Sequence, residues 1–97
     1  MDFPRLSAVE PIAGKRLRVT FADGTIKIYD CTHLLETQAF RPLKDEAFFR
    51  RAHVEPHGYA VVWNDQVDLA ESELWLHGVS PTIAEPRQAV PGAAAQA

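Results

Sequence analysis

Two short runs of residues on either side of Asp23-Gly24 constrain the fold more than any other part of the sequence. In residues 15–21, apolar side chains alternate with polar ones, and the apolar ones are Leu17, Val19 and Phe21. This period of two is typical of a β-strand with one buried face. An Asp-Gly pair between two such runs favours a two-residue type I′ turn. We therefore predict a β-hairpin over residues 15–30.

The register of this hairpin decides which side chains share a face. A two-residue loop pairs Phe21 with Ile26 and Val19 with Ile28, so that the apolar residues lie together. If the loop were one residue longer, every side chain of the second strand would move to the opposite face of the sheet. The match of apolar residues favours the shorter loop. The opposite, polar face would then hold Arg16, Arg18, Thr20, Lys27 and Tyr29.

The rest of the chain supplies further strands and short helices. We expect strands at 6–12, 59–63 and 67–69, an extended segment at 53–55, and short helices that begin near Asp30 or Thr32, at Asp45 and at Glu71. Phe40 and Leu43 are expected in the core, with Ala47, Phe48, Phe49 and Ala52 facing inward, and Trp63 against Phe48 or Phe49. This order predicts an α+β domain: a small antiparallel sheet built from two hairpins, with short helices packed on one face.

The composition changes after Gly78. Three prolines and an alanine-rich end follow, with no sustained strand or helix period. We predict a single domain over residues 1–78 and a flexible tail over residues 79–97. A domain of this size buries only about 60–65% of its unfolded surface, so a dimer interface would add stability.

Charge and cysteine content exclude several classes of function. Thirteen acidic and ten basic residues give a net charge of −3, which argues against nucleic-acid binding by overall charge. No apolar run approaches the roughly 20 residues of a membrane-spanning helix, and the N-terminus lacks the pattern of a secretory signal. Cys31 is the only cysteine, so no intrachain disulfide can form. We expect a cytoplasmic protein with no cofactor and no metal.

The order of the apolar landmarks resembles a bacterial family, domain of unknown function 2442. The residues that carry this resemblance are Leu17–Gly24, Tyr29-Asp30, Leu34, Leu35, Phe40, Leu43, Phe48, Phe49, Trp63–Ala70 and Leu74-Trp75. The resemblance covers residues 5–76, and Trp63–Ala70 is its most specific part. Gln66 stands where the family usually has glycine, and Trp75 where it often has tyrosine.

The resemblance implies a fold and no reaction mechanism. Some relatives carry an added helix-turn-helix segment that binds DNA, for which the tail of this chain is too short and too rich in proline. Other relatives are encoded beside a small toxin-like protein. That association implies a partner-binding, antitoxin-like role.

Two groups of residues are candidates for chemistry. Cys31 and His33, with Asp30 beside them, could form a nucleophile pair, or they are a half-buried thiol and a surface imidazole. His53 and His57 have the spacing of two metal ligands on a helix, with Glu55 between them. Pro56 and Gly58 argue against a helix there, which favours solvated polar side chains.

An acidic cluster lies near the end of the folded part: Asp65, Asp68, Glu71 and Glu73. Its spacing does not fit a calcium loop, and so small a domain offers no deep cleft for a pair of catalytic carboxylates. We favour helix capping, in which Asp68 or Ser72 accepts amide hydrogen bonds at the start of the last helix.

Six residues form the candidate interface: Arg16, Arg18, Lys27, Tyr29, Trp63 and Trp75. The basic face of the first hairpin could contact nucleic acid, stay solvated, or dock onto a partner with Arg18 and Tyr29 as anchors. Trp75 either marks an interface or closes the core, and Trp63 is expected in or near the core.

These observations favour a non-enzymatic protein-interaction module that binds a protein partner or itself as a homodimer. The first alternative is a regulator that contacts nucleic acid through Arg16, Arg18 and Lys27. A small metal-dependent enzyme around His53 and His57 is the weakest of the three hypotheses.

Overall fold

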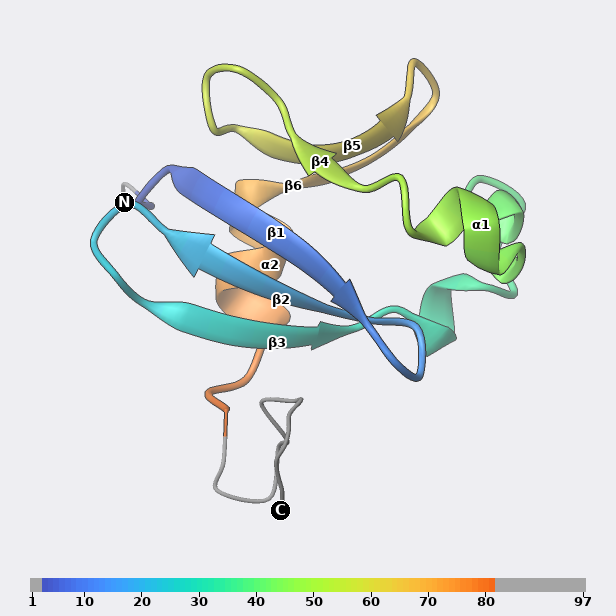
Figure 1. Cartoon of the computed structure of the whole chain (residues 1–97), viewed down its shortest axis with the longest axis horizontal. Coiled ribbons are helices and arrows are strands. Elements are labelled where there is room, and N and C mark those ends of the chain that lie inside the picture. The colour runs from blue at the N-terminus through green and yellow to red at the C-terminus, as the bar shows by residue number, and fades with distance from the viewer. Residues whose placement is uncertain (1–2, 82–97) are drawn as a thin grey trace.

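The computed structural model describes residues 3–81 and has two three-stranded antiparallel sheets (Figure 1). The first has the order β1 (Leu6–Ile12), β2 (Arg16–Phe21), β3 (Ile26–Asp30), and the second β4 (His53–Val54), β5 (Ala60–Asn64), β6 (Val67–Ala70). The helices are η1 (Thr32–Leu34), η2 (Arg41–Lys44), α1 (Glu46–Phe49) and α2 (Glu71–His77). The predicted α+β class is confirmed. Most of the predicted tail, residues 82–97, lies outside the described residues.

The elements surround one core. Helix α2 covers one face of the first sheet, the second sheet lies along the β1 side, and η2 and α1 form one end of the molecule (Figure 1). Within residues 3–81, no helix covers the other face of the first sheet, which faces the viewer in Figure 1. No helix in this part of the chain is long and apolar enough to cross a membrane.

The turn between β2 and β3 differs from the predicted type I′ turn. Its loop has three residues, because the amide of Phe21 donates to the carbonyl of Thr25 at 2.8 Å and the amide of Gly24 donates to the carbonyl of Phe21 at 2.9 Å. Gly24 has φ 92°, whereas Asp23 is not in the positive-φ region that a type I′ turn requires of both residues. This is the geometry of a turn followed by a glycine bulge.

The longer loop shifts the register by one residue and corrects the predicted faces. Leu17 pairs with Tyr29, Val19 with Lys27 and Arg18 with Ile28. Tyr29 and Lys27 therefore share the inner face with Leu17 and Val19, towards α2, because opposite residues lie on the same face. Ile26 and Ile28 join Arg16 and Arg18 on the outer face.

The second hairpin has the shorter loop. Asn64 pairs with Val67, so that only Asp65 and Gln66 lie between the strands. The side-chain oxygen of Asn64 accepts hydrogen bonds from the amides of Gln66 and Val67, at 2.8 and 2.9 Å. This Asn side chain holds the turn closed without a glycine.

Gly58 joins the two sheets. Its carbonyl accepts a hydrogen bond from the amide of Leu6 at 2.8 Å, and its φ is 78°. A Cβ at this position would lie 2.7 Å from the carbonyl oxygen of Leu6. Both the close approach and the backbone conformation therefore require glycine.

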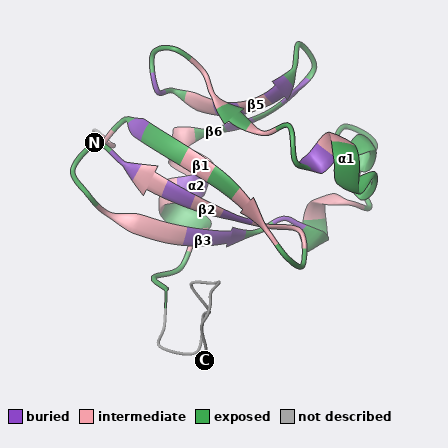
Figure 2. Cartoon of the chain, in the orientation of Figure 1, coloured by how far each residue is buried: buried purple, intermediate pink, exposed green. Residues whose placement is uncertain are grey.

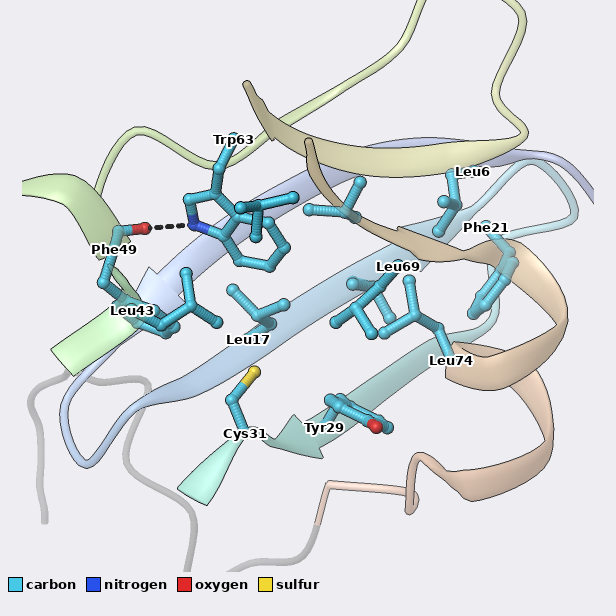
Figure 3. Packing of buried hydrophobic residues seen from close by; sticks show 13 residues of the cluster. Leu6, Leu17, Phe21, Tyr29, Cys31, Leu43, Phe49, Trp63, Leu69 and Leu74 are labelled. Atoms are coloured by element: carbon cyan, nitrogen blue, oxygen red, sulfur yellow. Dashed lines mark hydrogen bonds between the residues drawn. The ribbon is translucent and has the colours of Figure 1, made fainter. Parts of the chain in front are cut away.

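Trp63 lies in the core, as predicted. The indole is 2% exposed, its Nε1 donates to the carbonyl of Phe49 at 2.9 Å, and the two rings stack with centroids 6.3 Å apart (Figure 3). Leu43 is fully buried and Phe40 packs partly against the core. Of the helix residues expected to face inward, Phe49 is buried and Phe48 and Ala52 are half-buried, but Ala47 is exposed because α1 is a single turn.

Strand β3 forms an edge of the first sheet, and the chain returns to it after α2. The amide of Ile28 donates to the carbonyl of Val79 at 2.7 Å, and the amide of Val79 donates back at 2.9 Å. Val79, the first residue of the predicted tail, therefore forms a bridge with the sheet instead of leaving the fold.

Candidate interaction surfaces

The predicted basic face of the first hairpin is divided between the two faces of the sheet. Arg16 and Arg18 lie on the outer face and Lys27 on the inner one. The ammonium of Lys27 donates to the carbonyl of Trp75 at 2.6 Å and lies 4.4 Å from the centroid of that indole's ring. Lys27 therefore contacts α2, and the three cations do not form one surface.

Tyr29 is buried and connects β3 to α2. Its side chain is 1% exposed, and its hydroxyl donates to Glu73 Oε2 at 2.7 Å, with His33 Nε2 3.4 Å away. Burial, followed by the neighbouring Glu73 carboxylate, raises the pKa of the phenol well above its usual value. The phenol stays neutral and donates, and in this structure neither Tyr29 nor Trp63 is accessible to a partner.

Trp75 combines the two roles considered for it. It is half-buried, and its ring packs edge-on against Phe21 with centroids 5.0 Å apart. Leu76 and Val79, close by in the sequence, are 62% and 63% exposed. Trp75 therefore closes the core, while exposed apolar surface lies around the end of α2.

The geometry at Cys31 does not support a nucleophile. The side chain is fully buried, and burial, with a smaller contribution from Asp30, raises the pKa of the thiol to about 12. At neutral pH the thiolate is therefore negligible, and the thiolate is the reactive form. His33 lies beside the hydroxyl of Tyr29. The side chain of Asp30 accepts hydrogen bonds from the amide and hydroxyl of Thr32, but Cys31 occupies the N-cap position of η1 and no side chain caps this helix.

His53 and His57 have separate partners. His53 Nδ1 lies 3.1 Å from the carbonyl of Arg51, and His57 Nδ1 lies 3.4 Å from Glu55 Oε2. Residues 3–81 bring no three candidate metal ligands together.

The predicted cap of the last helix is wrong. Ala70 occupies the N-cap position of α2, where no side chain accepts a hydrogen bond, and Asp68 is exposed on β6. The amide of Glu71 donates instead to the carbonyl of Tyr59, at 2.8 Å, because β6 runs directly into the helix. Glu71 and Glu73 do lie in the first turn, where the helix dipole favours them.

A first surface is the outer face of the first sheet, hereafter the outer face. Its residues are Ala8, Glu10 and Ile12 on β1, Arg16, Arg18 and Thr20 on β2, and Ile26 and Ile28 on β3. Glu10 pairs with Arg18 across the strands, with 3.9 Å between carboxylate and guanidinium. Ile12 and Ile26 are only half-buried, whereas Ile28 is buried; strands β1–β3 are coloured by burial in Figure 2. Sequence reasoning missed Ile26 here because it placed the residue in the core.

A second surface lies on η2 and α1, at the end of the molecule. Four exposed cations, Arg41, Lys44, Arg50 and Arg51, occur within residues 41–51, hereafter the basic segment. Sequence reasoning missed these four cations, although their close spacing is visible in the sequence.

These features define the chain as a small α+β domain with an open sheet face. The model of the family described as "protein of unknown function (DUF2442)" matches residues 6–80, and the chain belongs to that family. The resemblance identified from the landmark residues is thereby confirmed.

One solved structure extends the comparison. The crystal structure of a putative DNA binding protein from Nitrosomonas europaea is 33% identical, with a TM-score of 0.59. The match covers 68% of this chain and 45% of that one, so this chain spans less than half of the solved protein. No curated protein matches the chain.

Proposed function

We propose that this chain is a non-enzymatic protein-interaction module that pairs with a second copy of itself through the outer face. The observation that carries the proposal is that half-buried isoleucines flank an ion pair on an uncovered sheet face. An antiparallel sheet with one solvated face normally shows polar side chains there. Ile12 and Ile26 depart from that pattern, and apolar surface of this kind marks contact sites.

The charges on the outer face suit a two-fold symmetric pair. In such a dimer the same patch meets itself, so each charge must find its opposite on the same surface. Glu10 and Arg18 supply one charge of each sign, and the 3.9 Å between them is too long for a hydrogen bond. In a face-to-face pair, Arg18 would approach the partner's Glu10 while the isoleucines are covered. An antitoxin-like complex with a different protein would use the same face.

The non-enzymatic part of the proposal is supported by the burial of the reactive side chains. Cys31 is fully buried with a raised pKa, and the phenol of Tyr29 is bonded to Glu73. Neither group is placed to act on a ligand from solvent.

Charge exchange across the outer face tests the proposal. We expect sedimentation equilibrium to show a dimer whose Kd rises about tenfold or more in Glu10→Arg and in Arg18→Glu, because each creates like charges across the two-fold axis. The double variant Glu10→Arg/Arg18→Glu restores opposite charges and should recover most of the affinity. Glu36→Arg, an exposed acid outside the sheets, is the matched control.

Two results would contradict self-association through this face. One is a protein that remains monomeric at millimolar concentration. The other is a dimer whose Kd responds to Glu36→Arg as much as to Glu10→Arg.

Nucleic-acid contact is a second candidate function. The observation that favours it is the solved relative described as a putative DNA binding protein. Less than half of that protein is matched, so its activity is only proposed for this chain. The surface first considered for this function is divided, because Lys27 lies on the inner face.

A further inference from the structure

The charges of this chain are segregated along its length. Residues 3–51 contain nine Lys or Arg and six Asp or Glu, whereas residues 52–81 contain five Asp or Glu and no Lys or Arg. The net charge of −3 therefore hides a basic part and an acidic part. Such asymmetry orients a protein in the field of a charged partner.

The basic segment has cations with no ion pair to any carboxylate among residues 3–81. Both acids of the segment already have partners. Asp45 accepts a hydrogen bond from the amide of Ala47 at 3.0 Å. Glu46 forms ion pairs with Lys15 at 2.9 Å and with Arg50 at 3.3 Å. Within residues 3–81, no carboxylate pairs with Arg41, Lys44 or Arg51. These three cations are exposed and remain available to an anionic partner.

Aromatic rings are interleaved with these cations. Phe40 precedes Arg41, and Phe48 lies between Lys44 and Arg51; both rings are half-buried. The guanidinium of Arg51 lies 5.7 Å from the centroid of the Phe48 ring. In the 3₁₀ helix η2, Arg41 and Lys44 are one turn apart and project from the same side.

We propose that the basic segment binds the backbone of single-stranded nucleic acid, with the Phe48 ring and the Arg51 guanidinium as a stacking surface for a base. Cations that follow the phosphates, combined with aromatic faces for bases, are the usual elements of such sites. An acidic protein surface would use the cations but would have no use for the rings. This inference goes beyond the proposed self-association and does not depend on it.

Salt-dependent binding of a labelled oligonucleotide tests the site. We would measure the fluorescence anisotropy of dT12 and of rU12 with the full chain, from about 25 to 200 mM KCl. Each phosphate contact to a single strand contributes about −0.7 to the slope of log K against log salt, so three to four contacts give roughly −2 to −3. Absence of binding at the lowest salt would overturn the proposal.

Two matched variants locate the contact. Arg41→Gln should weaken binding about threefold or more and reduce the slope by about 0.7. Arg5→Gln removes the same charge at the residue before β1 and should leave the slope unchanged. Equal effects of the two variants would mean that only the overall charge is sensed, which would also overturn the proposal.

The aromatic surface separates nucleic acid from an acidic protein. Phe48→Leu keeps an apolar side chain but removes the π face, so it should weaken dT12 binding by about threefold to tenfold. A polyglutamate of equal length should compete poorly with dT12. If polyglutamate competes equally and Phe48→Leu binds normally, the partner is an acidic protein and not nucleic acid.

Discussion

The β2–β3 and β5–β6 hairpins reverse the chain over loops of three and two residues, and they hold those loops closed in different ways. In the first, Gly24 has a positive φ, and Asp23 Oδ1 accepts a hydrogen bond from the amide of Thr25. In the second, the side chain of Asn64 accepts hydrogen bonds from two backbone amides, and neither loop residue has a positive φ.

One residue more or less in a loop decides which face of the returning strand is buried. The first hairpin therefore buries Tyr29 and leaves Ile26 outside, whereas the second buries Val67 and Leu69 as the pattern indicates.

The largest expected effect lies in the second hairpin, at Trp63. Trp63→Ala should lower the free energy of unfolding by about 3–5 kcal/mol, because it removes the centre of the core and the hydrogen bond to Phe49. Trp63→Phe keeps a ring, so about 1–3 kcal/mol is expected. Urea denaturation gives both values. Equal losses in the two variants would mean that the bond to Phe49, and not ring packing, holds α1 to β5.

Alkaline pH should destabilise the protein through the first hairpin. The pKa of Cys31 is raised to about 12, and that of Tyr29 is raised as well, so the folded state keeps protons that the unfolded state loses. Stability is then fully present below about pH 9 and falls as the pH rises, by about 1.4 kcal/mol per unit for each ionising group. Urea midpoints between pH 8 and 11 measure this.

Cys31→Ala is the variant that assigns this pH dependence. It should reduce the fall in stability between about pH 9 and 10, the range in which an unfolded thiol ionises before an unfolded phenol does. A fall of unchanged steepness would show that Cys31 is not protected from ionisation in the folded protein.

Tyr29→Phe tests the register of the first hairpin directly. If the hydroxyl is buried and bonded to Glu73, its removal should cost about 1–2 kcal/mol. Tyr59→Phe is the matched control, because Tyr59 is 48% exposed and its change should stay within about 0.5 kcal/mol. Equal effects in the two variants would favour the register with the shorter loop.

Replacing the glycine of the β2–β3 turn, and introducing a glycine into the β5–β6 turn, tests how each loop is held closed. Gly24→Ala should cost about 1 kcal/mol, because its φ of 92° strains any residue with a Cβ. Gln66→Gly should also destabilise, by about 0.5 kcal/mol, because a glycine gains freedom in the unfolded chain without relieving strain in the fold. A gain of stability in Gln66→Gly would show that the Asn64 turn does carry strain.

The smallest expected effect concerns the corrected helix cap. Asp68→Ala should change stability by less than about 0.5 kcal/mol, because its side chain caps nothing. Asp45→Ala should cost about 1 kcal/mol, because Asp45 accepts the amide of Ala47 at the start of α1. Thermal denaturation compares the two, and a larger loss in Asp68→Ala would reinstate the cap on α2.

The sequence predicted most strands, the α+β class and the position of Trp63, because alternation and β-branched residues report burial directly. It did not predict the β2–β3 register, because an Asp-Gly pair fits both a two-residue turn and the end of a three-residue loop. The face assignments of Lys27 and Tyr29 depended on that register and changed with it. The cap of α2 was missed because a backbone carbonyl, that of Tyr59, contacts the first amide of the helix, and no side-chain pattern reports such a contact.

The bridge between Ile28 and Val79 covers part of the edge of β3, where other chains could otherwise add. An unpaired edge strand is a template on which other chains can add, and proteins commonly block such edges with short covers and prolines. If the pairing of Val79 with Ile28 is continued, Pro81 falls opposite Ile26, where it has no N–H to extend the ladder. The cover therefore ends after one bridge and cannot grow into a further strand. A chain cut after Gly78 would leave Ile28 unpaired, and we expect it to polymerise edge to edge more readily than the full chain.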